Sequence, residues 1–130
     1  MSKWYIKELS KLTGISVQTL HHYDRIGLLK PSLRLSNGYR VYNRNDLLRL
    51  QQIIALKYFG FSLSQINKLL ASEKDALTHF KAQIESLEAK ASTLLEASGV
   101  LKQIIKDKTE VVNIPWENLI KMIEVYRMSE

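Results

Sequence analysis

The segment SVQTLHHYDRIGLLKP, residues 16–31, has the pattern of a short helix with a defined start and a defined end. Ser16 is a favourable residue before a first helical turn, because its hydroxyl can accept a hydrogen bond from a free backbone amide. Gly27 lies where a left-handed residue can end the helix at little cost. The apolar face of this helix repeats at helical spacing and consists of Val17, Leu20, Tyr23 and Ile26.

A second short helix is expected just before this segment, over residues 5–12. Ile6, Leu9 and Leu12 are spaced by three residues, and Gly14 supplies the stop. Only residues 13–16 then join the two helices. The pair predicts a helix-turn-helix, the unit that places the start of its second helix in the major groove of DNA.

Beyond Leu28 the hydrophobic period changes and then becomes helical again. The Asn37-Gly38 pair is a hairpin signal, so we expect a small two-stranded wing between residues 28 and 42. A third helix is expected to start at Asn43, and a fourth at Ser62, which forms a capping box with Gln65. Their expected inward side chains are Leu47, Leu50, Ile53, Ile54 and Leu56 in the third helix and Leu63, Ile66, Leu69 and Leu70 in the fourth.

Residues 77–108 carry more than four heptads, in which seam positions alternate spacings of three and four. Such a narrow apolar stripe on one long helix needs a partner helix to bury it, so the pattern predicts a dimer. Ser98 is the polar seam position. The apolar seam positions are Leu77, Phe80, Ile84, Leu87, Ala91, Leu94, Leu101 and Ile105.

We therefore expect a mostly α-helical chain in three parts. Residues 1–72 form a winged helix-turn-helix domain, and residues 76–108 form a dimerisation coiled-coil helix. Residues 109–130 form a short C-terminal segment in which an amphipathic helix restarts at Trp116. This segment ends without a capping glycine or a polar tail, so we expect the natural chain to continue past Glu130.

Composition narrows the class of protein. The 130 residues contain no Cys, which excludes disulfides and thiolate metal sites, and we expect no metal and no cofactor. No apolar run approaches the roughly 18 residues of a membrane span, and the first residues lack the pattern of a signal peptide. We expect a cytoplasmic protein that does not contact membranes.

The positive charge is concentrated in the first half of the chain. Residues 1–72 hold 11 Lys and Arg against 3 Asp and Glu, whereas residues 73–130 hold 8 against 10. A basic first half is either a solvated surface or the electrostatic footprint of a nucleic acid. The expected helix-turn-helix lies in that half and favours double-stranded DNA as the partner. Its early polar positions, which can reach base edges or phosphates, are Gln18, Thr19, His21 and His22.

Three motifs in order, SVQTLHHYDRIGLLKP, NGYRVY (residues 37–42) and YFGFSLSQI (residues 58–66), resemble the DNA-binding domain of the MerR family of bacterial transcription regulators. The resemblance covers residues 5–72, and the TLHHYD variant is most similar to the multidrug and antibiotic-sensing branch. Gln18 and His21 stand at two positions that usually hold Arg in that motif.

The resemblance implies which residues contact DNA. Thr19, His21, His22 and Tyr23 would lie along the recognition helix, and Phe59 to Ser62 would form a second wing. Further phosphate contacts could come from Arg44 and Arg49. The complete set that we expect to bind DNA is Ser16, Gln18, Thr19, His21, His22, Tyr23, Arg34, Asn37, Gly38, Tyr39, Arg40 and Lys57. For Tyr39, packing in the core and contact with DNA are about equally plausible on chemical grounds.

The resemblance also implies how the protein works. Family members form homodimers through an antiparallel coiled coil and bind a palindromic promoter site. They bend and untwist the promoter so that RNA polymerase engages both of its elements. In the branch that this chain resembles, a ligand domain follows the coiled coil, and residues 109–130 look like the beginning of one.

Other functions compete with this one. A DNA-bending architectural protein or an excisionase-like protein would share the winged fold without any regulatory ligand. A coiled-coil interaction module would use its basic half only for solubility. An enzyme is not expected, because the sequence has no glycine-rich phosphate loop, no nucleophile elbow and no paired metal-ligand spacing.

Overall fold

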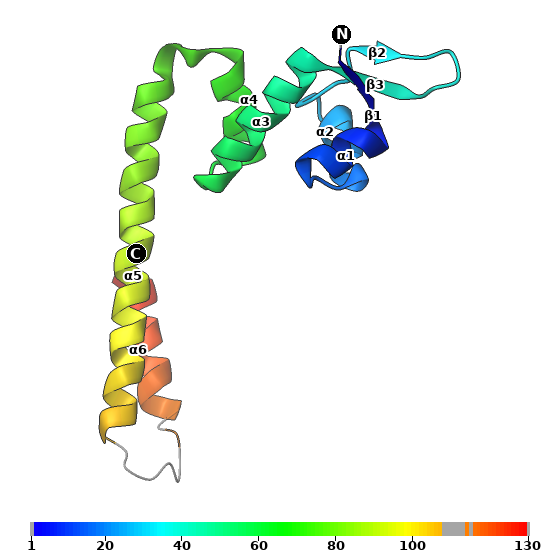
Figure 1. Ribbon diagram of the computed structural model, residues 1–130. Coiled ribbons are helices and arrows are strands. Elements are labelled where there is room, and N and C mark those ends of the chain that lie inside the picture. The colour runs from blue at the N-terminus through cyan, green and yellow to red at the C-terminus, as the bar shows by residue number, and fades with distance from the viewer. Residues whose placement is uncertain (1, 108–113, 115, 130) are drawn as a thin grey trace. The chain divides into compact units, whose positions relative to one another are not determined.

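The computed structural model describes residues 2–107, 114 and 116–129 (Figure 1). The chain divides into two compact units, Met1–Ser86 and Leu87–Glu130. None of the described helices is both long enough and apolar enough to cross a bilayer.

The first unit contains a helix-turn-helix near its start. Helix α1 spans Ile6–Thr13 and helix α2 spans Val17–Arg25. Gly14, with φ of 76°, ends α1 in the left-handed conformation. The Ser16 hydroxyl caps α2 by accepting a hydrogen bond from the Thr19 amide at 3.1 Å. Both helices lie within one residue of their expected bounds.

The expected two-stranded wing is present as the β2–β3 hairpin, and a strand that the sequence did not predict, β1, extends it to a three-stranded antiparallel sheet in the order β1-β3-β2. Strand β1 spans Lys3–Tyr5, β2 spans Leu33–Arg34 and β3 spans Arg40–Asn43. The β2–β3 hairpin turns at Gly38, whose φ is 86°. The additional strand β1 pairs with the far side of β3, with Tyr5 opposite Val41.

Two helices follow the wing in the first unit. Helix α3 spans Arg44–Tyr58 and α4 spans Leu63–Ala71. Capping boxes open both helices, from Asn43 with Asp46 and from Ser62 with Gln65, as the sequence predicts for the second. Ile54 is exposed, which corrects its expected core position, because it lies about 100° around the helix from the buried Ile53.

The core of this unit joins the helix-turn-helix, the wing and the following helices. Tyr42 of β3 is fully buried at its centre, and its hydroxyl has no hydrogen-bond partner among the residues that the structure describes. Burial of the phenol, with the nearby Asp24 carboxylate, raises the pKa of Tyr42 to about 12. The other buried members of the cluster are Leu9, Leu20, Tyr23, Leu28, Leu29, Leu50, Ile53, Phe61, Ile66 and Leu69.

A short 3-10 turn, Glu73–Asp75, leads into the long helix α5, Ala76–Asp107. The large apolar side chains of the expected seam are all exposed, from 40% at Phe80 to 73% at Leu77. Helix α6 spans Trp116–Ser129, starting where the sequence predicts, and exposes Trp116, Ile120 and Ile123. Residues 109–113, 115 and 130 of the expected C-terminal segment lie outside the described residues, as does residue 108 at the end of the expected coiled-coil helix.

Candidate nucleic-acid interface

Helix α2 presents polar side chains along its first two turns. Gln18 and His22 are exposed, and Thr19 and His21 are partly exposed. The Ser16 hydroxyl is occupied by the helix cap and also donates to the Thr19 hydroxyl at 2.8 Å. Gln18 and His22 are therefore the side chains most open to a base edge, and Ser16 serves first as the residue that starts the helix.

Tyr23 does not face outward with them. Its side chain is only 4% exposed and belongs to the hydrophobic core, and burial raises the pKa of its phenol. This position corrects the expected DNA contact. The physical reason is the helical period, because Tyr23 lies on the same face as Leu20, three residues earlier.

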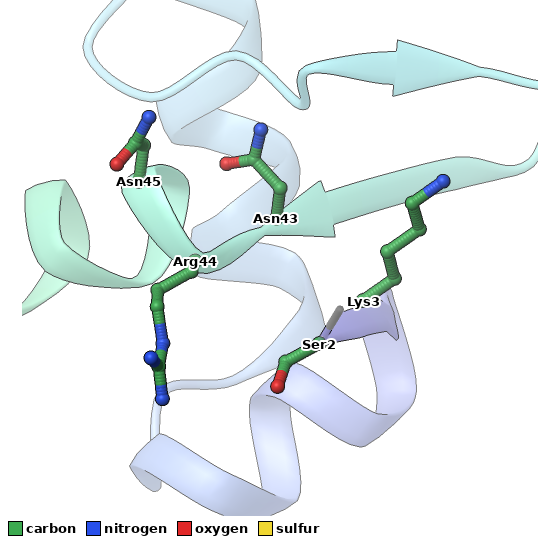
Figure 2. Close-up of a pocket in the computed structure, with 5 residues that line it drawn as sticks. All are labelled: Ser2, Lys3, Asn43, Arg44 and Asn45. Carbon is green, nitrogen blue, oxygen red and sulfur yellow. The ribbon is translucent and has the colours of Figure 1, made fainter.

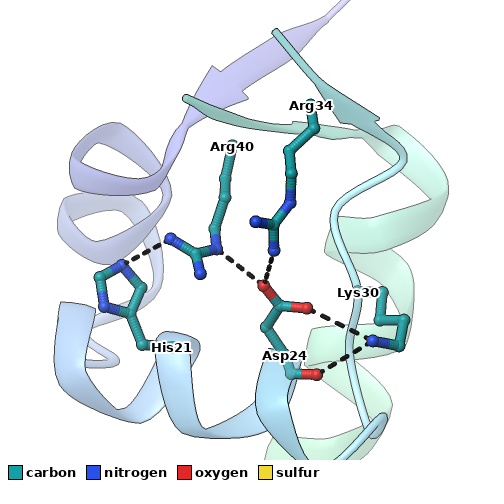
Figure 3. Close-up of polar contacts among 5 residues, drawn as sticks. All are labelled: His21, Asp24, Lys30, Arg34 and Arg40. Carbon is teal, nitrogen blue, oxygen red and sulfur yellow. Dashed lines mark hydrogen bonds and ion pairs between the residues drawn. The ribbon is translucent and has the colours of Figure 1, made fainter. Parts of the chain in front are cut away.

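Asp24, in the last turn of α2, gathers three cationic side chains (Figure 3). Its Oδ2 accepts hydrogen bonds from Arg34 Nη2 and from Arg40 Nε, the latter at 2.7 Å. Its Oδ1 lies 3.7 Å from Lys30 Nζ, which also donates to the Asp24 carbonyl oxygen at 3.3 Å. The Asp24 side chain is 6% exposed. One buried carboxylate thus ties the wing and the preceding loop to the recognition helix.

Electrostatics explain why this carboxylate stays ionised. Burial alone would raise the pKa of Asp24, but the hydrogen bond from Arg40 and the positive charges of Arg34, Arg40 and Lys30 outweigh it and hold that pKa below its ordinary value. Sequence reasoning did not single Asp24 out. The sequence did contain one signal, because Asp24 is the only acidic residue between Glu8 and Asp46.

The three cations differ in how much of each remains available. Lys30 and Arg34 have side chains 68% and 53% exposed, so they can bind phosphate while paired with Asp24. Arg40 is only 24% exposed and is held on two sides, by Asp24 and by His21, whose Nε2 lies 3.3 Å from Arg40 Nη1. The guanidinium of Arg40 is therefore engaged mainly in contacts within the protein, whereas the charged groups of Arg34 and Lys30 remain exposed to solvent.

The wing tip carries the remaining predicted contacts. The Asn37 side chain accepts a hydrogen bond from the Tyr39 amide at 3.0 Å, which fixes the turn that Gly38 completes. Tyr39 is exposed, and its ring contacts that of Tyr5 edge to face, with centroids 6.1 Å apart. The structure therefore places Tyr39 on the surface and not in the core.

Other cations of this unit have separate surroundings. Arg49 donates from Nε to the Leu28 carbonyl at 2.9 Å, a contact that holds the loop after α2. Lys57 is exposed in the last turn of α3. Arg44 lies at the start of α3, where it lines an open hollow of about 460 Å³ together with Lys3 and three uncharged polar residues, Ser2, Asn43 and Asn45 (Figure 2).

The expected second wing is only partly exposed. Phe59 is exposed, and its carbonyl accepts a hydrogen bond from the Gln83 side chain at 2.6 Å. Phe61 is buried and its ring lies 5.9 Å from that of Phe80 in α5. This segment therefore connects the base of α5 to the core. Among the described residues, no group of three His, Asp or Glu side chains is arranged to hold a metal ion.

Comparison with known proteins agrees with this architecture. Residues 5–73 match the model of the MerR HTH family regulatory proteins. The chain is 41% identical over 108 residues to the HTH-type transcriptional regulator SkgA of Caulobacter vibrioides, an overlap of 82% of this chain and 42% of SkgA. The chain thus spans less than half the length of that relative.

Solved structures give the same picture. A MerR family transcriptional regulator from Bacillus cereus superposes with a TM-score of 0.81 at 26% identity, covering 98% of each chain. HiNmlR, a MerR family regulator lacking the sensor domain, superposes with a TM-score of 0.59 at 25% identity over 78% of this chain and 86% of its own. HiNmlR was solved bound to promoter DNA.

Proposed function

The chain belongs to the MerR family of helix-turn-helix regulatory proteins, and we propose that it regulates transcription by binding a palindromic promoter site as a homodimer. The observation that carries this proposal is the cluster on Asp24. It holds exposed cationic groups of Lys30 and Arg34 beside a recognition helix whose polar side chains are open. Cations beside a groove-reading helix are what phosphate and base contacts require together.

The contacts divide by chemistry. Gln18, Thr19, His21 and His22 are proposed to read base edges, because amide, hydroxyl and imidazole groups match the donors and acceptors of the major groove. The groups proposed to position the protein on phosphates and sugars are Ser16, Arg34, Asn37, Gly38, Tyr39 and Lys57, with Lys30 added from the structure. Arg40 is proposed to contribute to DNA binding indirectly, through its contacts with Asp24 and His21.

Homodimerisation is proposed from the exposed seam of α5. An apolar row of this length is unfavourable in water, and a second copy offers the matching row. The antiparallel direction of the pair rests on the family alone. Two recognition helices about one turn of DNA apart would then read the two halves of a palindrome.

The regulatory step is proposed to be a change in DNA shape. A dimer bound between the promoter elements would bend and untwist the spacer, which costs about 1–6 kcal/mol by elastic estimates. The exposed cations of two protomers supply phosphate contacts that can offset such a cost. RNA polymerase is then recruited by way of the promoter, without a direct contact being required.

Selection of duplexes from a random pool by the wild-type protein tests the proposal. We expect enrichment of a palindrome, and affinity for it that falls steeply as salt rises. Arg34→Ala should weaken binding to all sequences alike, whereas Gln18→Ala should change the preference at particular base pairs. Absence of any enriched sequence would contradict the proposal. Enrichment without an effect on transcription in vitro would instead indicate an architectural protein.

A further inference from the structure

A chain of contacts runs from the buried Asp24 to the recognition helix by way of the wing. Arg40 Nε donates to Asp24 Oδ2 at 2.7 Å, and Arg40 Nη1 lies 3.3 Å from His21 Nε2 (Figure 3). Asp24 and His21 are both in α2, three residues apart, and Arg40 reaches them from β3. One guanidinium therefore bridges two residues of the same helix.

The chemistry of this bridge determines which ring nitrogen of His21 carries the proton. A guanidinium has only donors, so the nitrogen that faces it, Nε2, must be the acceptor. A neutral imidazole then holds its proton on Nδ1. In Figure 3, Nδ1 lies on the side of the ring away from Arg40. Within the described residues it has no hydrogen-bond partner, so His21 presents a free donor.

We propose that Asp24 is a positioning residue for base recognition, which through Arg40 fixes His21 as a hydrogen-bond donor toward the major groove. This inference rests on the proposed function. The acceptors that such a donor can read are guanine O6 and N7, adenine N7 and thymine O4. The amino groups of cytosine and adenine are excluded, because a donor cannot bind another donor.

The carboxylate is needed for this role and not the arginine alone. A free arginine side chain has many rotamers, and its anchoring at a buried oxygen removes most of that freedom before DNA arrives. Lysine cannot replace it, because a single ammonium group cannot hold both Asp24 Oδ2 and His21 Nε2 in the planar geometry of a guanidinium. Lys30 and Arg34 also contact Asp24, but no described contact links them to His21.

Pool selection with matched variants tests this inference. The wild-type protein, Asp24→Asn, Arg40→Lys and His21→Ala are each used to select duplexes from the same random pool. Asp75→Asn is the control, because it makes the same change in net charge at an exposed carboxylate in the turn before α5. Thermal unfolding of every variant is measured alongside.

We expect Asp24→Asn, Arg40→Lys and His21→Ala to lose preference at the same base pairs, by about tenfold, the discrimination that one good base-edge contact provides. Asp75→Asn should keep the wild-type preferences. Nitrogen-15 spectra should show His21 protonated on Nδ1 in the wild type and a mixture of ring forms in Arg40→Lys.

Three outcomes would overturn the inference. One is that folded Asp24→Asn and Arg40→Lys keep the preference that His21→Ala loses. Another is that Arg40→Lys, which preserves charge, weakens selected and scrambled duplexes equally, as a merely structural role predicts. The third is a wild-type ring protonated on Nε2. Failure of the wild-type protein to select any sequence would refute the proposed function itself, so the two failures are distinguishable.

Discussion

Replacing Leu87 by Asp should convert the protein from a dimer to a monomer. Leu87 lies in the middle of the α5 seam and is 42% exposed in the single chain. Full burial of a leucine stabilises by about 1.5–3 kcal/mol, so covering the remaining surface contributes about 1 kcal/mol per copy and about 2 kcal/mol per dimer. The substitution removes this term from both copies.

The aspartate adds a larger penalty, because each carboxylate must be desolvated in the interface or hold the helices apart, at several kcal/mol. A total of about 5 kcal/mol corresponds to between three and four powers of ten in the dimer dissociation constant.

Sedimentation velocity at micromolar concentration measures this change. Ala89→Asp is the matched control, because it places the same charge on the same helix at an exposed position away from the seam. We expect this control to remain dimeric and both variants to keep their helical circular dichroism. A Leu87→Asp protein that sediments as a dimer would refute the coiled-coil interface.

Three further results are expected. The pKa of Asp24 is lowered, so its ion pairs stabilise the fold above the ordinary carboxyl pKa, and this stabilisation is lost as the pH falls through the lowered value. Denaturant titrations of Asp24→Asn should therefore show an unfolding free energy about 2 kcal/mol below that of the wild type at neutral pH, a difference that closes in acid. A difference that stays constant with pH would contradict this linkage. Arg49→Ala should cost about 1 kcal/mol of unfolding free energy by leaving the Leu28 carbonyl unpaired, with selected base preferences unchanged; altered preferences would place Arg49 at the DNA instead. A protein of these 130 residues should bind its duplex without any small molecule, because every proposed DNA contact lies between Ser16 and Lys57; calorimetry that finds a saturable cationic or hydrophobic compound with an effect on duplex affinity would disprove this.

Local signals predicted most of the fold. The caps at Ser16 and Ser62 and the stop at Gly14 depend only on nearby backbone groups, so their positions could be read directly from residue order. The position of strand β1 could not be read in this way, because its three residues gain a stabilising partner only in β3, about 38 residues later in the chain. Pairing between strands so far apart in the chain produces no recognisable pattern within a short stretch of sequence.

The site was predictable to a lesser degree. The hydrophobic period placed Tyr23 on the inner face of α2, and the structure agrees with the period and not with the DNA contact that the family resemblance implied. Asp24 was overlooked because its partners come from the loop and from two strands. The role of a single carboxylate emerges only when those elements are assembled around it.

The hydroxyl of Tyr42, which has no hydrogen-bond partner in the described part of the chain, has a practical consequence for experiments on this protein. A buried polar group without a hydrogen bond costs about 1–3 kcal/mol, so Tyr42→Phe should raise the melting temperature without changing the packing of the ring. Scanning calorimetry measures the gain, and a fall in melting temperature would show that the hydroxyl is solvated after all. Natural proteins are rarely at their maximum stability, so stabilising substitutions of this kind are commonly available. The phenylalanine form would then be a more tolerant parent for the Asp24 and Arg40 variants, in which loss of recognition can be studied without loss of folding.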